Sequence, residues 1–381
     1  MKKKIFVVAG EKSGDVLGSK ILEQLDKDTF EVSGIGGEMM EKRGLRSLFS
    51  MNELSVMGLF EVLPKIFKLL TLIKKTAEYI VNTEQDILFT IDSPSFCFRV
   101  AKLVKKLSKN KKIKLVHFIA PSVWVYKADR AGKIAKIYDL LFCILPFEPP
   151  YFEKYGLKTV FVGHPIFDKE SIEYGFNGDE IMEYNRNSNI ISITVGSRKS
   201  ELKILLPIVL KVIKKLKDRY ENLRYFILAT DYTYDIIQNE LKIRDINYIS
   251  VEKNVDKKNR IIKDSLFSIA KSGTNTLEIA GYSIPMIVIY KFGFLTNKIA
   301  RLMKITSKTK FVNLINVLNQ RDIIPEFTLD NCTVANIFEM SCRFVEDEYW
   351  RLRQVKENIK TLELLGYKQN NSSTRIIVNH L

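Results

Sequence analysis

The chain has 381 residues, too many for one ordinary hydrophobic core, so we expect two domains of roughly 150–200 residues each. Its 46% hydrophobic and 27% charged residues are typical of a soluble globular protein, and no apolar run reaches the roughly 18 residues that a membrane span needs. The net charge of +16 favours polyanionic partners: nucleic acid, anionic lipid headgroups or phosphorylated substrates. A mutational bias toward Lys, Ile and Asn explains part of the charge equally well.

In the first half, short apolar runs of the kind buried in a parallel sheet alternate with helical patterns. The runs cover residues 5–9, 31–35, 86–91, 114–119, 140–144 and 159–162. Glycine-containing joints separate them, and Pro64 interrupts or kinks one helical pattern. This alternation predicts a doubly wound α/β domain.

After a polar connection over residues 168–189, a second series begins. Its apolar runs cover residues 190–195, 224–229, 247–251, 266–270 and 285–290. The expected fold class is therefore α/β, with two Rossmann-like domains facing a cleft. We place the first domain at 1–168 and the second at 169–344, and we expect helices over about 345–381 to pack back on the first.

The cysteines and histidines do not indicate a metal site. No CxxC spacing occurs, so we expect reduced cysteines in the core of a cytosolic protein. The four are Cys97, Cys143, Cys332 and Cys342. We interpret His117 as a core residue, and His164 as structural or cleft-lining. The start of the chain has too few apolar residues before Gly10 for a secretory signal.

Two turns in the second half join a strand end to a helix start through small residues. One is Gly196-Ser197-Arg198, and the other runs from Ser272-Gly273-Thr274 to Glu278. Free backbone N–H groups and the helix dipole at such turns suit a diphosphate, and a carboxylate can accept hydrogen bonds from ribose hydroxyls. Arg198 can neutralise a departing UDP, although a surface arginine is the alternative. Together the turns predict a nucleotide-sugar site.

In the first half, Asp92 directly follows a buried strand, where functional groups of an open α/β sheet gather. It is a candidate general base, with a helix N-cap as the alternative. Glu11 and Asp15 make the turn over 10–18 acidic, which suits sugar hydroxyls better than phosphate, unless this is only a tight βα turn. Trp124 is either a shelf for a sugar ring or a buried anchor.

Residues 56–75 mix apolar groups with lysines and almost no acid. Such a stretch can lie in a membrane interface, and an ordinary amphipathic core helix is the alternative. The residues predicted to meet the acceptor or membrane are Met57, Phe60, Lys65, Phe67, Lys68 and Trp124. Asn316, in an Asn-rich segment beside aliphatic residues, fits hydrogen bonding to a base or sugar amide.

Many of these motifs occur in a familiar order. They include Ala9-Gly-Glu11-Lys-Ser-Gly-Asp15, Asn52-Glu-Leu-Ser-Val-Met-Gly58, Ile91-Asp92-Ser-Pro, Pro121-Ser-Val-Trp124, Leu145-Pro-Phe-Glu148, Gly163-His-Pro165, Gly196-Ser-Arg198 and Ser272-Gly-Thr274. In this the chain resembles the lipid-A-disaccharide synthases, inverting glycosyltransferases of the GT-B type. Two departures stand out: Thr194-Val195 replaces Leu-Pro before the Gly-Ser-Arg turn, and Lys271 replaces a small residue before Ser-Gly-Thr.

The resemblance implies transfer of 2,3-diacylglucosamine from its UDP derivative to 2,3-diacylglucosamine 1-phosphate, without metal or other cofactor, on the inner face of the inner membrane of a Gram-negative bacterium. By position, it makes Asp92 the catalytic base and Glu11 a second essential carboxylate. The implied UDP-binding residues are Arg198, Gly196, Ser197, Ser272, Gly273, Thr274, Glu278 and Asn316. Partners then include the two lipid substrates and an anionic membrane surface; the sequence leaves open whether the chain forms a homodimer.

Three other functions compete. A transferase acting on peptidoglycan precursor is expected to carry a GGxGG-type turn near its start, which this chain lacks. A soluble UDP-GlcNAc 2-epimerase has no need of the basic, apolar stretch over 56–75. A nucleic-acid-binding protein is disfavoured because the basic residues are spread over both halves and no binding motif is present, so we predict no nucleic-acid partner.

Overall fold

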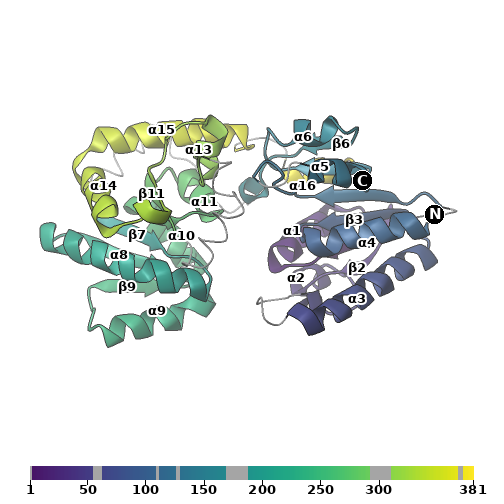
Figure 1. Cartoon of the computed structure of the whole chain (residues 1–381), viewed down its shortest axis with the longest axis horizontal. Helices are drawn as coiled ribbons and strands as arrows, with labels where there is room; N and C mark the ends of the chain where they lie inside the picture. Colours follow the sequence, from purple (N-terminus) through teal and green to yellow (C-terminus); the bar gives the residue numbers. More distant parts are fainter. Residues whose placement is uncertain are drawn as a thin grey trace. The chain divides into compact units, whose positions relative to one another are not determined.

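The computed structural model describes residues 2–54, 62–108, 111–125, 129–168, 188–291, 310–367 and 372–381, with only the backbone for 62–66. The chain forms two compact units, each built around one parallel sheet (Figure 1). The first unit comprises Met1–Lys169 and Leu365–Leu381, and the second comprises Glu170–Leu364. The segment that returns to the first unit therefore starts at Leu365, later than the residue 345 expected from the sequence.

The first sheet has six parallel strands in the order β2-β1-β3-β4-β5-β6. They are β1 (Lys3–Ala9), β2 (Phe30–Ile35), β3 (Ile87–Ile91), β4 (Lys114–Phe118), β5 (Leu140–Cys143) and β6 (Lys158–Phe161). The accompanying helices are α1 (Lys12–Gln24), α2 (Glu38–Glu41), α3 (Val62–Asn82), α4 (Pro94–Leu107), α5 (Arg130–Ala135), α6 (Pro149–Glu153) and α16 (Ser373–Val378), with 3-10 turns at Met51–Leu54 and Pro165–Asp168. All six predicted apolar runs are strands.

Both faces of this sheet are covered. Along β1, Phe6 and Val8 pack into a buried cluster with residues of α3 and α4. The alternate residues Ile5 and Val7 pack on the other face with residues of α1 and α16. Because neither face meets water, the strands are apolar at nearly every position, which is why they were visible in the sequence.

The second sheet is also parallel, in the order β12-β11-β10-β7-β8-β9. Its strands are β7 (Ile190–Thr194), β8 (Arg224–Leu228), β9 (Ile249–Glu252), β10 (Ser265–Lys271), β11 (Met286–Tyr290) and β12 (Glu326–Thr328). Its helices are α8 (Lys199–Arg219), α9 (Asp231–Ile243), α10 (Val255–Lys263), α11 (Asn275–Gly281), α13 (Leu314–Asn319), α14 (Val334–Glu346) and α15 (Glu348–Leu364), with a 3-10 turn at Leu329–Asn331. The strand β12 was not predicted, because three half-buried residues give no apolar run.

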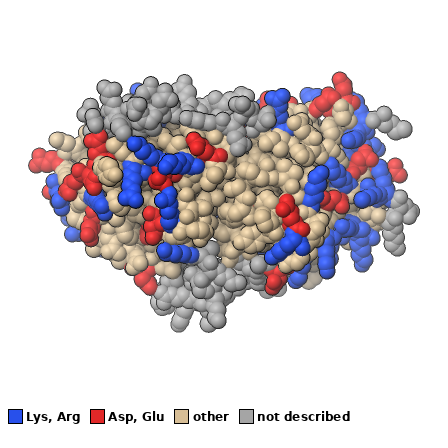
Figure 2. Space-filling model, turned by 90° about the horizontal axis from the view of Figure 1, so that it is seen from above, with Lys and Arg blue, Asp and Glu red and all other residues tan. Residues whose placement is uncertain are grey.

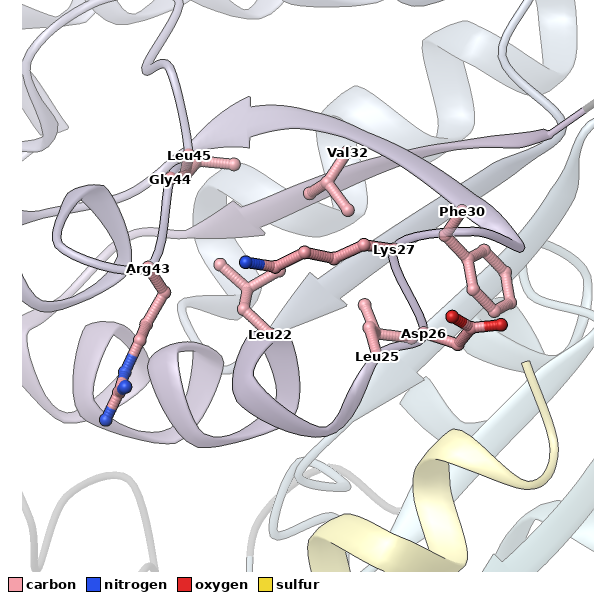
Figure 3. Close-up of a pocket in the computed structure, with 9 residues that line it drawn as sticks. All are labelled: Leu22, Leu25, Asp26, Lys27, Phe30, Val32, Arg43, Gly44 and Leu45. Carbon is pink, nitrogen blue, oxygen red and sulfur yellow. The ribbon is translucent and has the colours of Figure 1, made fainter.

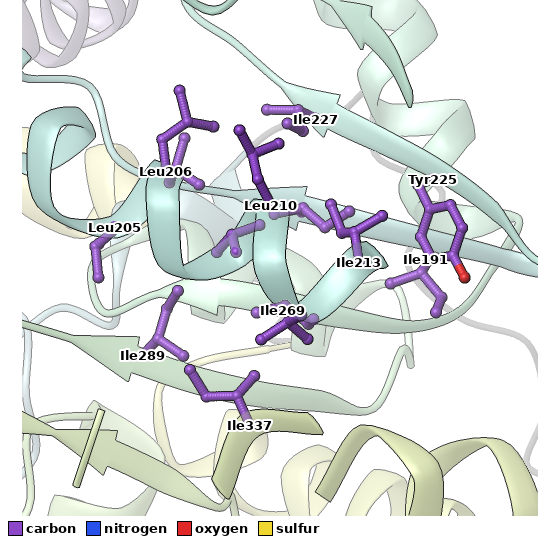
Figure 4. Close-up of a cluster of buried hydrophobic side chains, with 14 of the residues drawn as sticks. Ile191, Leu205, Leu206, Leu210, Ile213, Tyr225, Ile227, Ile269, Ile289 and Ile337 are labelled. Atoms are coloured by element: carbon purple, nitrogen blue, oxygen red, sulfur yellow. The ribbon is translucent and has the colours of Figure 1, made fainter. Parts of the chain in front are cut away.

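Helix α8 places a buried stripe on the second sheet. Leu206, Leu210 and Ile213 of this helix lie in one buried cluster with Ile191 of β7 and Ile337 of α14 (Figure 4). The spacing of three and four residues sets these side chains on one helix face. The start of α8 is thereby fixed at the end of β7.

The last helix, α16, completes the first unit. The Asp168 carboxylate accepts hydrogen bonds from the backbone N–H groups of Ser373 at 2.8 Å and Thr374 at 3.3 Å. Gln24 of α1 donates to the Thr374 hydroxyl at 2.9 Å. Ile377 is fully buried in the cluster that contains Ile5 and Val7.

The four cysteines are buried and free, and His117 is a core residue, as predicted. Burial lowers the pKa of His117 to about 3, and the Thr90 hydroxyl lies 2.7 Å from its Nδ1 atom. Burial also lowers the pKa of His164 to about 4, and its Nδ1 accepts a hydrogen bond from the N–H of Ile166. Both imidazoles are therefore neutral near pH 7 and serve packing.

Candidate active site

The two predicted catalytic carboxylates lie at one edge of the first sheet. Strands β1 and β3 are neighbours, and Glu11 and Asp92 follow directly after them. The two turns touch: a Cβ atom on Gly10 would lie 2.4 Å from the Ser93 hydroxyl oxygen. Only glycine fits at position 10, because any side chain there would push Ser93 away.

Asp92 has an unusual backbone. Its φ is 49° and that of Ser93 is 46°, so two consecutive non-glycine residues occupy the left-handed region. Such residues cost about 1–3 kcal/mol each and persist only where the surrounding structure holds them. Here the N–H of Asp92 donates to the carbonyl of Phe118 at 3.0 Å, which ties the turn to β4. The Asp92 side chain is half-buried and forms no hydrogen bond or ion pair within the described residues.

Glu11 occupies the N-cap position of α1, yet its exposed side chain forms no capping hydrogen bond. The charges of Glu11 and Asp92 both act on the buried thiol of Cys97. Burial raises the pKa of Cys97 most, and the charges of Asp92 and then Glu11 raise it further. Both carboxylates therefore lie within electrostatic reach of one buried atom.

Asp15, the third acid of this region, has a structural role. Its buried carboxylate accepts hydrogen bonds from the N–H groups of Gly37 at 2.8 Å, Met39 at 3.0 Å and Met40 at 3.1 Å. It caps the start of α2 and is not available to a sugar. The acidic lining predicted for this turn is reduced to Glu11.

Trp124 and Glu148 lie beyond β4 and β5. Trp124 is half-buried and packs edge-to-face on Phe147, with ring centroids 5.2 Å apart. Glu148 was not predicted as a site residue; its carboxylate accepts from the N–H groups of Ile144 and Leu145 at 3.2 and 3.0 Å. Burial raises the pKa of Glu148 to about 7, against the lowering effect of these two hydrogen bonds.

In the second unit, the Gly196-Ser197-Arg198 turn joins β7 to α8. Gly196 has a φ of +103°, which a glycine adopts without strain. The N–H groups of Ser197 and Arg198 were predicted to be free, and this is wrong. They donate to the Glu201 carboxylate at 3.1 and 3.4 Å. The Arg198 side chain is 80% exposed, with its guanidinium 4.0 Å from Glu201.

Lys271, at the end of β10, meets the same carboxylate. Its ammonium lies 3.0 Å from Glu201 Oε1, and both side chains are largely enclosed, at 19% and 16% exposure. The hydroxyl of Thr194 accepts from the Lys271 N–H at 3.3 Å and from the Asn275 amide at 2.8 Å. The β7–α8 and β10–α11 turns are therefore joined directly, through both residues that depart from the family pattern.

Ser272 is buried, and its hydroxyl donates to the carbonyl of Val312 at 3.0 Å. Gly273 and Thr274 are exposed at the start of α11. Glu278, on the next turn of α11, is half-buried, and its charge adds to burial in raising the pKa of Tyr282 to about 12. These four residues lie on one turn and the helix that it opens.

Asn316 is fully buried and its amide is fully used. It donates to the carbonyl of Ile324 and to Glu326, both at 2.8 Å, and accepts from the N–H groups of Ile323 and Ile324 at 2.9 Å. Glu326 also accepts from the N–H of Val312 at 2.8 Å. Asn316 therefore holds the segment that contacts Ser272, and no atom of its amide is left for a ligand.

The stretch over 56–75 is described only in part. Met57 and Phe60 lie outside the described residues, as does the side chain of Lys65. On α3, Phe67 is 75% exposed, whereas Lys68 forms an ion pair with Glu53 at 3.0 Å. The helix buries its later residues in the core and leaves apolar groups exposed near its start.

A cavity of about 260 Å³ lies elsewhere in the first unit, between the end of α1 and the start of β2 (Figure 3). Leu22, Leu25 and Phe30 line it with Lys27 and Arg43. Neither Glu11 nor Asp92 lines this cavity, so it is separate from the candidate active site.

Basic and acidic side chains are interspersed over the face drawn in Figure 2. Some form ion pairs, such as Arg219 with Glu346 at 2.7 Å. The described residues contain no group of three or more His, Cys, Asp or Glu arranged to hold a metal ion. No described helix combines the length and apolar character needed to span a bilayer.

Comparisons with known proteins identify close relatives. A family model described as lipid-A-disaccharide synthetase matches residues 5–379. The lipid-A-disaccharide synthase of Rickettsia felis is 41% identical, covering 98% of this chain and 94% of its own length. That of Rickettsia prowazekii is 40% identical, covering 98% and 97%. The resemblance drawn from the motifs is confirmed.

Solved structures with the same fold are more distant in sequence. The MnaA–UDP structure from S. aureus has a TM-score of 0.65 at 14% identity, covering 99% of this chain and 95% of that one. MurG of Acinetobacter baumannii has a TM-score of 0.58 at 13% identity, covering 100% and 99%. The predicted fold class, two Rossmann-like domains of the GT-B type, is confirmed.

Proposed function

Because the chain belongs to the lipid-A-disaccharide synthase family, we propose that it moves 2,3-diacylglucosamine from UDP-2,3-diacylglucosamine to the 6-hydroxyl of 2,3-diacylglucosamine 1-phosphate. The products are the β-1,6-linked disaccharide 1-phosphate and UDP. The chain is thus an enzyme, an inverting glycosyltransferase. The structural observation that carries the assignment of the site is that Glu11 and Asp92 lie together at the carboxyl edge of the first sheet.

Inversion needs a base on the acceptor side. The acceptor oxygen attacks C1 of the donor sugar, the C1–O bond to UDP breaks, and its electron pair leaves with the diphosphate. We assign the removal of the hydroxyl proton to Asp92, whose carboxylate has no competing partner in the described residues and whose backbone is held in place from β4. Glu11, exposed beside it, is assigned to acceptor hydroxyls.

The second unit is assigned to UDP. The exposed guanidinium of Arg198 would neutralise charge on the departing diphosphate. Gly196 and Ser197 shape its turn, the Ser272-Gly273-Thr274 turn lies beside it, and Glu278 is assigned to the ribose. Asn316 is assigned an indirect role, because its buried amide is satisfied within the protein.

The acceptor and donor carry acyl chains, which calls for a membrane surface. Exposed Phe67 and Leu70 on α3, near Lys68, would insert apolar groups between anionic headgroups. We therefore propose peripheral binding to the inner face of the inner membrane, with assembly as a homodimer. Replacing Lys65, Lys68, Lys74 and Lys75 by Glu should weaken sedimentation with anionic vesicles; light scattering in detergent would report the oligomeric state. Unchanged sedimentation would exclude this surface.

The reaction is tested by UDP release from UDP-2,3-diacylglucosamine in detergent micelles, with and without 2,3-diacylglucosamine 1-phosphate. Release that depends on the acceptor and yields a disaccharide supports the proposal. If the two lipid substrates are not turned over but UDP-GlcNAc itself is, the chain would instead belong among the enzymes of simple sugars.

A further inference from the structure

The carboxylate of Glu201 lies between the backbone N–H groups of the Gly196-Ser197-Arg198 turn and the cationic side chains beside it. Glu201 Oε2 accepts from the N–H groups of Ser197 and Arg198, and Oε1 faces the ammonium of Lys271 at 3.0 Å. It also fills the concave side of the turn, since a Cβ on Gly196 would lie 2.3 Å from Glu201 Oε2. These are the donors that an incoming phosphate oxygen would seek.

The backbone of Lys271, whose ammonium pairs with Glu201, is held firmly. The backbone N–H of Lys271 donates to the Thr194 hydroxyl, and the same hydroxyl accepts from Asn275. The Lys271 stem runs past the ring of Tyr290, with its ammonium 5.6 Å from the ring centroid. Its backbone is therefore fixed between two turns, while a flexible four-carbon side chain lets the ammonium change partners.

We propose that Glu201 is a built-in counterion of the UDP site, which a diphosphate displaces so that Lys271 becomes a further phosphate-binding residue. The inference rests on the proposed function, because it takes the Gly196-Ser197-Arg198 turn to be where UDP binds. Carboxylate and phosphate compete for the same donors, so Glu201 lowers the affinity for UDP and favours its release. It also keeps the charge of Lys271 compensated before substrate arrives.

The test is UDP binding to the full-length protein by titration calorimetry. Glu201→Gln keeps an oxygen that can accept the turn N–H groups but removes the charge and frees Lys271. The expected Kd for UDP falls by about tenfold, with a steeper loss of affinity as salt rises. Lys271→Met leaves the negative charge of Glu201 uncompensated beside the phosphates, so the Kd of this variant for UDP should rise by about tenfold. In the double variant the gain from Glu201→Gln should shrink, because the two residues act on each other.

Glu252→Gln is a matched control. Glu252 accepts from the N–H groups of Lys253 at 2.9 Å and Asn254 at 2.8 Å, and lies 4.0 Å from Lys257, but it is the last residue of β9, the edge strand of the sheet. Its loss should leave UDP affinity unchanged. Weaker UDP binding by Glu201→Gln would overturn the proposal and make Glu201 only a helix cap; an unchanged Kd in Lys271→Met would also overturn it. Absence of UDP binding by the unmodified protein would instead overturn the proposed function.

Discussion

Replacing Gly10 by alanine tests whether contact between two turns holds the catalytic carboxylate in place. The new Cβ would lie 2.4 Å from the hydroxyl oxygen and 2.6 Å from the Cβ of Ser93, about 1 Å closer than ordinary contacts near 3.5 Å. No side-chain rotation can relieve this clash, because the position of a Cβ atom is fixed by its backbone. Ser93 must shift, and Asp92 shifts with it.

The expected cost is about 1–3 kcal/mol in the free energy of unfolding, as for overpacking in a core. Activity should fall further, by roughly 10²-fold in kcat, since a displacement of about 1 Å at a catalytic group costs that much. Urea unfolding gives the first quantity, and acceptor-dependent UDP release gives the second.

Gly14→Ala, in the first turn of the following helix α1, is the matched control. Its Cβ would meet Ala9 at 3.4 Å and the Ile91 carbonyl at 3.5 Å, which are ordinary contacts, and alanine favours the helix. Ser93→Gly should rescue Gly10→Ala, because it removes the clashing side chain and suits a φ of 46°. Wild-type stability and kcat in Gly10→Ala, or no rescue by Ser93→Gly, would refute the reasoning.

Four further substitutions separate the roles assigned above. Asp92→Asn should lower kcat by roughly 10²–10⁴ and leave the Kd for UDP unchanged in calorimetry; a large loss of UDP affinity would contradict its assignment as base. For Glu148, whose folded-state pKa is raised to about 7 from 4.5, the stability contribution is full below about pH 4.5 and is lost as pH rises through 7. Glu148→Gln should therefore gain stability relative to wild type between those pH values, by at most ~3 kcal/mol in urea unfolding, and a pH-independent difference would count against a raised pKa. Asn316→Ala should lower the free energy of unfolding by about 2–4 kcal/mol, because it leaves buried N–H groups without acceptors. A fully stable variant that fails to bind UDP would show instead that Asn316 contacts UDP directly. Phe67→Ser should reduce flotation with anionic vesicles while leaving the unfolding midpoint unchanged, since the ring is 75% exposed; unchanged flotation would exclude this ring from the membrane surface.

The sheets were predictable because strands that are buried on both faces give short, continuous apolar runs in the sequence. Residues 5–9 and 86–91 are examples: their side chains enter two different cores, so nearly every position is apolar. The strand Glu326–Thr328 was missed for the opposite reason, since it is half-buried at an edge. The length of the returning segment also escaped prediction, because a helical pattern does not say which domain its apolar face meets.

The sequence predicted which strand ends carry the candidate site residues better than it predicted the hydrogen-bond partners of those residues. The ends of β1 and β3, which are neighbours in the first sheet, supplied Glu11 and Asp92, and the end of β7 in the second sheet supplied Arg198. Which polar groups are already satisfied was not readable. Asp15 and Asn316 have the same chemistry as ligand-binding residues, yet their partners are backbone N–H groups brought close only by the fold. For Glu201 a signal existed, since Glu at the third helical position often caps a helix.

The placement of α16 sets an order of events during synthesis. Strand β1 is synthesised before the second unit, but the cluster around Ile5 and Val7 is completed by Ile377 and Leu381, which are made after the whole second unit. Until then the part of this sheet face that α16 covers lacks its partner, whereas the second unit is continuous in sequence and already has all its strands and helices. The first unit can therefore complete its core only after the second unit has been made.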